Sequence, residues 1–323
     1  MAGRLAAAAG GTLAAAAYVD DDFRRSLMVA VGGTGCRALL KLPNTLRLHD
    51  AHHLHGALDR PADVGLLTVS NHVATIDDPG LLAAMVPVGS LFRGGGQFRW
   101  GVCAEDVCFR PGSVIERFAA VSQVLPIVRG GGVWQPELLP IIDKLREGRW
   151  VHFFPEGIVR QDGHVRPFRR GVGRIVAALA GAAADQPPEP AASSSSAPSP
   201  AAERGAPSAR PHEERLLVIP FYHEGCERIQ PTTPTSTTVF SRTPEFGVPV
   251  HVIFGEPLDL RQAVGRHLDL AREPPFDRRP ELVFELVAHV LEEEVRALQA
   301  ELHRRLAREE QEAAAAAGRE SQT

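Results

Sequence analysis

The chain lacks the basic excess that general nucleic-acid binders usually carry. Its 323 residues include 35 lysines and arginines against 39 aspartates and glutamates, which gives a formal net charge of -4. A negative balance of this kind argues against nucleic acid as a general partner. With 44% hydrophobic and 23% charged residues, the chain is also too apolar to be disordered, and its length allows one sizeable core or at most two.

Cysteine is also scarce. The four cysteines are Cys36, Cys103, Cys108 and Cys226. They form no Cys-x-x-Cys pair, and no histidine stands at zinc-finger spacing from them. The sequence therefore predicts neither a disulfide framework nor a metal site, and it favours free thiols in the core.

No apolar run approaches the ~20 residues that a bilayer-spanning helix needs. The apolar segment at 27–36 is followed closely by Arg37 and Lys41. Residues 1–25 are rich in alanine and lack the Arg-rich amphipathic pattern of a strong organelle presequence. We therefore expect a disordered N-terminus at 1–25. At 26–60 we expect a segment that lies in a bilayer interface, with the two cations reaching lipid phosphates.

The same segment carries an alternative motif. Residues 33–38 fit the pattern G-x-G-x-x-A after an apolar run, and Asp50 could end a second strand, as in a dinucleotide-binding unit. Pro43 limits the following helix to barely two turns, and the acid comes early. Nicotinamide or flavin binding is therefore the weaker alternative for this segment.

The clearest candidate for catalysis is a His-x4-Asp pattern. The strand-like run at 64–69 leads to His72, and Asp77 follows five residues later, just before Asp78-Pro79 open a helix. The pKa of histidine lies near neutrality, and a carboxylate can hold one ring nitrogen protonated while the other accepts a proton from an alcohol. The spacing alone also fits a turn histidine beside a helix-capping acid.

A second candidate position follows a buried strand at 124–128. This strand ends at Arg129, and three glycines from Gly130 onward would let a ligand approach the backbone. A guanidinium placed there suits a phosphate, through charge-assisted hydrogen bonds worth roughly 1.5–3 kcal/mol each. The alternative is that Arg129 is simply the exposed end of a strand.

A third candidate position follows the buried strand at 150–154, which delivers Glu156 and Gly157 into a turn. A carboxylate at the end of an apolar strand is costly unless it binds a hydroxyl or an arginine. A basic cluster comes next and indicates an anionic partner. Its members are Arg160, Arg166, Arg169, Arg170 and Arg174.

Taken together, four stretches resemble the motifs of the glycerolipid (1-acylglycerol-3-phosphate-type) acyltransferase superfamily. They are Asn71-His72 with Asp77, Val128-Arg129-Gly130, Phe154-Pro155-Glu156-Gly157 and Val218-Ile219-Pro220-Phe221-Tyr222-His223. Finer similarities at 68–79, 150–157 and 166–174 resemble the tafazzin family within that superfamily. The resemblance covers residues 25–180 and 215–260.

The resemblance implies an α/β fold, a single acyltransferase domain at 61–275 whose central sheet is flanked by helices. Residues 182–214 inside it are low-complexity Ala, Pro and Ser, and we expect a disordered insertion there. Residues 276–323 are expected to form a long C-terminal helix and tail. The helix carries an apolar stripe at Phe284, Val287, Leu291, Val295, Leu298, Leu302 and Leu306. We expect this stripe to dock on the domain, with self-association through it as the less favoured alternative.

The resemblance also implies roles for individual residues. His72, oriented by Asp77, would act as general base on the free hydroxyl of a lysophospholipid. Both residues lie at a turn in this interpretation, so alanine at either position should abolish acyl transfer and leave the fold intact. Substrate-binding roles would fall to Asn71, Arg129, Gly130, Glu156, Gly157, Arg170 and Arg174.

In tafazzin-like enzymes the acyl donor is itself a phospholipid, so the resemblance implies no metal and no nucleotide cofactor. It implies a monotopic protein on a membrane surface, with phospholipids such as cardiolipin and lysophospholipids as substrates, at a mitochondrial membrane that faces the intermembrane space. Two alternatives stay open. One is a lysophospholipid acyltransferase that uses acyl-coenzyme A, and the other is a lipid-binding protein without catalysis.

Overall fold

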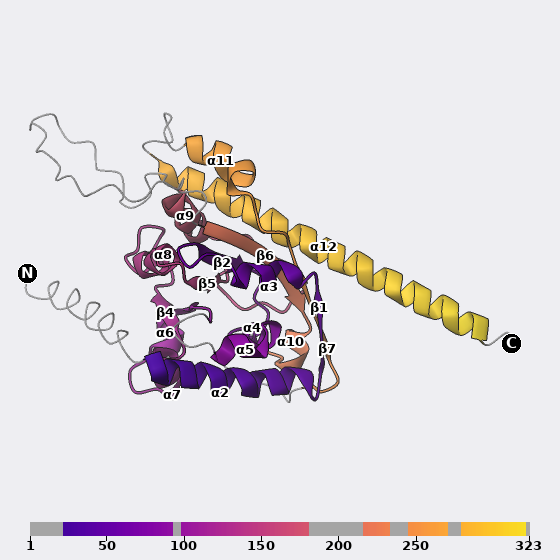
Figure 1. Cartoon of the computed structure of the whole chain (residues 1–323). Coiled ribbons are helices and arrows are strands. Elements are labelled where there is room, and N and C mark those ends of the chain that lie inside the picture. The colour runs from indigo at the N-terminus through magenta and orange to yellow at the C-terminus, as the bar shows by residue number, and fades with distance from the viewer. Residues whose placement is uncertain (1–21, 93–97, 181–215, 233–244, 271–278, 321–323) are drawn as a thin grey trace, which may run out of the picture.

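The computed structural model describes residues 22–92, 98–180, 216–232, 245–270 and 279–320, and Figure 1 labels its elements. In chain order these are α2 (Asp22–Lys41), β1 (Thr45–His49), α3 (His52–Leu58), β2 (Gly65–Val69), the 3-10 turn η1 (Thr75–Asp77), α4 (Gly80–Met85), α5 (Val88–Phe92), β3 (Gly101–Ala104), α6 (Glu105–Cys108), α7 (Val114–Val121), β4 (Val124–Ile127), α8 (Leu138–Arg146), β5 (Trp150–Phe153), α9 (Arg170–Leu179), β6 (Leu216–Glu224), α10 (Cys226–Ile229), β7 (Pro249–Phe254), α11 (Leu260–Leu270) and α12 (Pro280–Glu320).

A five-stranded sheet lies at the centre, in the order β1-β7-β6-β2-β5. β2 runs parallel to both of its neighbours, β5 and β6, and only β6 and β7 pair antiparallel. The parallel strands β3 and β4 form a separate pair that lies next to the β5 edge of this sheet. The two are joined there because the N–H of Trp100 donates to the carbonyl of Trp150 and the carbonyl of Trp100 accepts from the N–H of His152. The carboxyl ends of β2 and β5 therefore lie side by side, which brings together the loops that follow them.

Helices cover both faces of this sheet (Figure 1). Leu66 of β2 belongs to the core cluster that includes residues of α2, α3 and α4, whereas Leu67 and Val69 belong to the cluster that includes α8, α9 and α12. Successive side chains of a strand point to opposite faces, so β2 is buried from both sides and reads as an unbroken apolar run. The predicted α/β fold, with its central sheet and flanking helices, is confirmed.

The long C-terminal helix is also confirmed, as α12. It packs along α9 and β6 and continues past the domain as an exposed helix (Figure 1). Of the predicted stripe, Phe284, Val287, Leu291, Val295 and Leu302 are fully buried, and Leu298 and Leu306 are partly buried against the same core. The stripe is therefore covered within the chain, as predicted, and it does not provide a free surface for self-association.

The crossing of α9 and α12 depends on Gly173. A methyl group at this position would overlap with the backbone carbonyl of Phe284. We expect Gly173→Ala to lower the free energy of unfolding by about 1–3 kcal/mol, the usual effect of overpacking. Gly171→Ala on the same helix is a matched control, since its methyl group would meet only Leu138 at 3.9 Å. Urea unfolding of both variants tests this, and equal stability of the two would contradict it.

The segment predicted to lie in the bilayer interface forms α2. The helix begins at Asp22, before the predicted start at 26, and Gly33 and Gly35 lie in its middle. The apolar run that leads to these glycines is helical and not a strand, so the alternative of a dinucleotide-binding unit is wrong. Arg37 does not reach outward, because its guanidinium donates to the carbonyl oxygens of Ala84 (3.1 Å) and Val86 (2.6 Å) at the end of α4. The predicted contact of Arg37 with lipid phosphate is thus replaced by a helix cap.

Within the described ranges, no helix combines the length and the apolar character needed to cross a bilayer. Two predictions of disorder concern other parts of the chain. The N-terminal stretch is described only from Asp22 onward, and the predicted insertion at 182–214 lies outside the described residues.

The expectation of free thiols is wrong for two of the four cysteines. Cys103 at the end of β3 and Cys108 at the end of α6 form a disulfide, with their Cα atoms 6.1 Å apart. The short helix α6 turns the chain back on itself within five residues, which brings the two Cα atoms into the range that a disulfide requires. Cys36 and Cys226 are free.

Candidate active site

The loop that follows β2 is held by a side chain at its start. Asn71 is buried, and its amide nitrogen donates to the carbonyl of His223 (2.8 Å) while its oxygen accepts from the backbone N–H of the same residue (3.1 Å). Both ends of the amide are therefore used to fasten the loop to the end of β6. The structure gives Asn71 a positioning role in place of the predicted contact with substrate.

His72 and Asp77 lie together as predicted. The Nδ1 atom of His72 is 3.0 Å from Oδ2 of Asp77, and the carboxylate also accepts the backbone N–H groups of Val73 and Ala74, each at 2.8 Å. His72 is 17% exposed, whereas Asp77 is 1% exposed. Since Nδ1 carries the proton that faces the carboxylate, Nε2 is the nitrogen whose lone pair is available.

Asp77 keeps its negative charge despite this burial. Burial alone would raise the pKa of Asp77, but His223 beside it and the hydrogen bond from His72 together hold that pKa below its ordinary value. A charged carboxylate is what the orienting role requires, because it stabilises the imidazolium that forms when His72 takes up a proton. The turn is thus suited to general-base chemistry at Nε2.

The loop after β5 supports the other side of His72. The ring of Phe154 stacks on the imidazole, with ring centroids 3.9 Å apart and planes 10° apart. The backbone N–H of His72 donates to Oε1 of Glu156 (3.3 Å), and its carbonyl accepts from the N–H of Arg160 (2.9 Å). The backbone and the ring of His72 are therefore both fixed, which leaves the edge with Nε2 as its reactive side.

Glu156 is the second buried carboxyl of the site, 3% exposed. Burial raises the pKa of Glu156 to about 8 from an ordinary 4.5. At neutral pH the group is therefore largely protonated, and it can donate a hydrogen bond as well as accept one. Gly157 next to it has φ of +68°, a left-handed conformation that glycine adopts without strain.

This pKa predicts a pH-dependent stability. Below pH 4.5 both the folded and the unfolded chain hold the proton of Glu156. Between pH 4.5 and about 8 the unfolded chain loses it first, so the free energy of unfolding should fall as the pH rises, by about 1.4 kcal/mol per pH unit. Glu156→Gln should remove this slope. Urea unfolding of wild type and variant at pH 5.5 and 7.5 measures it, and parallel slopes in the two proteins would contradict the assignment.

The predicted phosphate-binding arginines have different environments. Arg174 is 2% exposed, donates to the carbonyl of Val133 (2.8 Å) and lies over the ring of Trp134. It is therefore a structural residue between α9 and the loop before α8, and its predicted contact with substrate is wrong. Its long side chain lies on the inner face of α9, which the charge pattern alone does not indicate.

The two other predicted arginines are half exposed. Arg129 faces Asp106 at 3.5 Å, and Arg170 faces Glu285 on α12 at 3.7 Å. Exposed ion pairs of this length contribute little to stability, so either guanidinium can exchange its partner for a phosphate. Gly130, with φ of +75° and no atom near a would-be Cβ, leaves room beside Arg129. These substrate-binding roles stay predictions.

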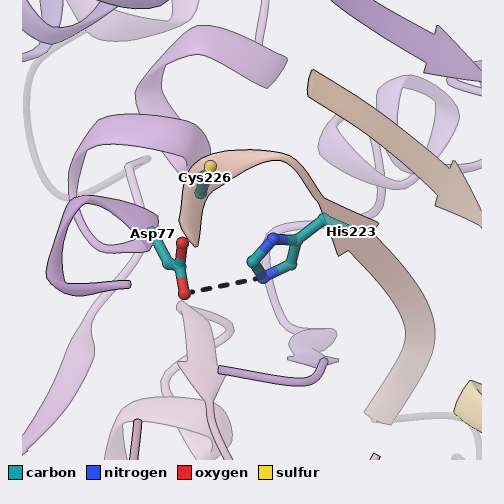
Figure 2. A group of neighbouring side chains, drawn as sticks. All are labelled: Asp77, His223 and Cys226. Atoms are coloured by element: carbon teal, nitrogen blue, oxygen red, sulfur yellow. Dashed lines mark ion pairs between the residues drawn. The ribbon is translucent and has the colours of Figure 1, made fainter. Parts of the chain in front are cut away.

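Sequence reasoning missed two neighbours of Asp77, both from the β6–α10 turn. The Nε2 atom of His223 lies 3.7 Å from Oδ2 of Asp77, and Cys226 lies beside the same carboxylate (Figure 2). All three side chains are buried, and they are the set within the site that could hold a metal ion. Burial raises the pKa of Cys226 well above its ordinary value, so it is a thiol unless a cation displaces its proton. His223 stood in the fourth motif, but the motif gave it no role.

Sequence reasoning also missed an ion pair next to the turn. Arg99 is fully buried, forms an ion pair with Asp78, and donates to the carbonyl of Ser122 (3.0 Å). The pair fixes the residue next to Asp77 to the start of β3. The sequence signal for this ion pair is the second of the two adjacent acids, Asp78. The sequence interpretation treats Asp78 only as a helix cap and so gives it no basic partner.

The chain is similar in sequence to known proteins. Residues 52–190 match the family model described as Acyltransferase. The chain is 35% identical to N-acylphosphatidylethanolamine synthase of Arabidopsis thaliana over 48% of its length and 54% of the relative's, and 29% identical to tafazzin of Drosophila melanogaster over 89% of its length and 63% of the relative's. It thus spans only about half to two thirds of these curated relatives.

Among solved structures, the chain is similar to the 1-acyl-sn-glycerophosphate acyltransferase of Thermotoga maritima. Its sequence identity is 15% and its TM-score is 0.45, over 88% of this chain and 87% of that one.

Proposed function

We propose that the chain, which matches the acyltransferase family model over residues 52–190 and is similar to the tafazzins, is a transacylase that exchanges acyl chains between phospholipids and lysophospholipids. The observation that carries the proposal is the pair of His72 and Asp77, with Nδ1 held by the carboxylate at 3.0 Å and the ring partly exposed. Among the described residues, none forms a hydrogen bond with Nε2 of His72.

In the proposed reaction, Nε2 of His72 takes the proton from the free hydroxyl of a lysophospholipid. The hydroxyl oxygen attacks the ester carbonyl of a donor phospholipid and forms a new carbon–oxygen bond. When the tetrahedral intermediate collapses, the bond to the donor oxygen breaks, and His72 returns its proton to that oxygen. Asp77 stays ionised throughout and stabilises the imidazolium. The products are a new phospholipid and a new lysophospholipid.

Glu156 and Arg129 supply two contacts that fit such substrates. Glu156 lies beside the backbone of His72 and, while protonated, can donate to an oxygen of the glycerophosphate. The guanidinium of Arg129 can take the phosphate itself. Both roles are part of the proposal. Cardiolipin as a substrate and a mitochondrial membrane as the location are also part of it, and their support is that tafazzins of three organisms are among the relatives.

The test is an assay of the purified chain with a phospholipid labelled in one acyl chain and an unlabelled lysophospholipid, with and without coenzyme A and acyl-coenzyme A. We expect the label to move to the lysophospholipid without any coenzyme. Transfer that depends on acyl-coenzyme A would replace the proposal with the alternative donor. No transfer under either condition, with lipid binding intact, would favour the non-catalytic alternative.

A second candidate is acyl transfer to an amine, because the plant relative is named N-acylphosphatidylethanolamine synthase and is 35% identical over the matched region. A histidine base can deprotonate an ammonium group as well as activate a hydroxyl. The same assay distinguishes the two when phosphatidylethanolamine is offered as the acceptor. An amide product resists mild alkaline methanolysis, whereas the ester of the first candidate does not.

Attachment to a membrane surface is part of the proposal and gives a prediction. Leu42 is 84% exposed at the end of α2 and Phe246 is 66% exposed before β7, and the N–H of Gly247 donates to the carbonyl of Pro43, which joins the two segments. The double variant Leu42→Ser, Phe246→Ser should bind vesicles more weakly than wild type. Leu139→Ser, an exposed leucine on α8, is the matched control.

Vesicle flotation measures this binding, with and without anionic lipid. Each cation near an anionic surface contributes about 1 kcal/mol, and salt screens that attraction but not apolar insertion. Binding of the wild type should therefore weaken at high salt and persist. Unchanged flotation of the double variant would show that these two side chains do not enter the bilayer.

A further inference from the structure

The carboxylate of Asp77 has two oxygens with different surroundings. Oδ2 receives all the hydrogen bonds that the carboxylate accepts from His72, Val73 and Ala74. Oδ1 is buried and accepts no hydrogen bond from an N–H or O–H group of any described residue. The thiol of Cys226 hydrogen-bonds to this carboxylate, but a thiol is a weak donor. Buried carboxylate oxygens are almost always satisfied, so a cation that displaces the thiol proton would be a stronger partner for the carboxylate.

His223 shows the same deficit. The side chain is fully buried, and Nε2 hydrogen-bonds to the carbonyl of Asn71 at 3.1 Å. Nδ1 is buried and has no hydrogen-bond partner among the described residues. A histidine that gives one N–H to a backbone carbonyl and keeps a lone pair on the other nitrogen has the arrangement of a metal ligand with its outer-shell contact already in place.

Cys226 completes the set. It is fully buried, and its sulfur, one oxygen of Asp77 and one ring nitrogen of His223 all lie within 4.8 Å of one another. Figure 2 shows Asp77 and His223 facing each other with Cys226 beside them; Asp77 comes from η1, and His223 and Cys226 come from the β6–α10 turn. Zinc-to-ligand bonds of 2.0–2.3 Å place tetrahedral ligands about 3.5 Å apart. Oδ2 of Asp77 and Nε2 of His223 are 3.7 Å apart, but both atoms already have hydrogen-bond partners. A cation held by Oδ1 and Nδ1 therefore requires the carboxylate and the imidazole to turn within the 4.8 Å cluster.

We infer that Asp77, His223 and Cys226 form a binding site for a divalent cation of the zinc class, and that its occupation inhibits the acyltransferase. Carboxylate, imidazole and thiolate together select Zn²⁺ and exclude Mg²⁺ and Ca²⁺, which take oxygen ligands. The cation binds the carboxylate that holds His72. It withdraws the negative charge that stabilises the imidazolium, so His72 becomes a weaker base.

The inhibition rests on the proposed function, whereas the binding does not, and the experiment measures the two separately. The full chain is titrated with Co²⁺ as a spectroscopic substitute for zinc, and Zn²⁺ affinity is measured by competition with a chelating dye. One equivalent of metal and a thiolate-to-cobalt charge-transfer band are expected. In the transacylase assay, buffered Zn²⁺ should inhibit at the concentrations at which it binds, and Mg²⁺ should not.

The variants are Cys226→Ser and Cys226→Ala. The activity of each variant with Zn²⁺ is compared with the activity of the same variant without metal, and urea unfolding checks that each variant is folded. Both should lose the cobalt band, and their Zn²⁺ affinity should fall by more than the roughly 10–100-fold that loss of an outer-shell partner costs. Cys36→Ser, which removes the other free thiol, should behave like wild type.

Equal metal affinity of wild type and either Cys226 variant would overturn the site, as would an equal loss in Cys36→Ser. Stoichiometric binding without inhibition of an active enzyme would overturn the inhibitory role alone. Binding that depends on Cys226 in a protein that shows no acyl transfer would support the metal site and count against the proposed function.

Discussion

Replacing His72 with alanine is expected to slow acyl transfer by about 10²–10⁴-fold, which is the usual contribution of a general base. The substitution removes Nε2, the proton acceptor of the proposed reaction, and leaves the binding groups of the other loops in place. The effect should therefore appear in kcat, with little change in KM, because His72 acts on the reacting proton and not on the ground-state complex.

The fold should tolerate this change. His72 is partly exposed, and Asp77 keeps the two backbone N–H groups of Val73 and Ala74 after the imidazole is gone. The main loss is the stacking contact with Phe154, worth about 0.5–1.5 kcal/mol. Thermal unfolding of the variant should therefore stay close to that of wild type.

His164→Ala is the matched control, since His164 is exposed on the loop that follows β5. It should keep full activity and full stability. If His72→Ala retained activity within a factor of about three of wild type, the catalytic assignment would have to be given up. If both histidine variants lost activity equally, the loop and not the base would be responsible.

Much of this site is predictable from the sequence because it depends on local order along the chain. The apolar run at 64–69 predicts a buried strand, and the structure forms β2 there. The five-residue spacing predicts the contact of His72 with Asp77, because a single turn spans it. Glu156 lies beside His72 for a related reason, since β2 and β5 are parallel neighbours and their carboxyl ends meet.

The partners of long polar side chains are not predictable in this way. Arg37 caps a helix 46 residues or more away, and Arg174 donates to a carbonyl 41 residues away. Such contacts depend on how distant segments pack, and a charge pattern gives no information about that packing. The basic cluster therefore suggested more phosphate-binding groups than the structure provides.

His223 and Cys226 were missed for the same reason. They reach Asp77 only because β6 pairs with β2 in parallel register, so that the turn after β6 arrives next to the turn after β2. A separation of about 150 residues hides this proximity, and the fourth motif could only indicate that the segment matters. The disulfide of Cys103 and Cys108 was missed because its spacing matches no motif and depends on the turn formed by α6.

The substitution Asp77→Ala is expected to remove both activity and a large part of the stability, which differs from the expectation based on the sequence. A turn position suggested that the fold would stay intact, but Asp77 is 1% exposed and accepts hydrogen bonds from His72, Val73 and Ala74. Alanine would leave the two backbone N–H groups unsatisfied. Each costs about 1–3 kcal/mol, so the free energy of unfolding should fall by about 2–6 kcal/mol.

Asp77→Asn separates the two effects. Its amide oxygen can still accept the backbone N–H groups, so most of the stability should remain. It cannot supply the negative charge that stabilises the imidazolium, so kcat should fall by about 10²–10⁴-fold, comparable to the loss of His72 itself. Asp143→Asn, at an exposed ion pair with Arg146 on α8, is the surface control and should change neither quantity. Stability is measured by urea unfolding and activity by the labelled-lipid assay. An asparagine variant with wild-type kcat would show that Asp77 only holds the turn, and the chemistry of His72 would then need another source of charge.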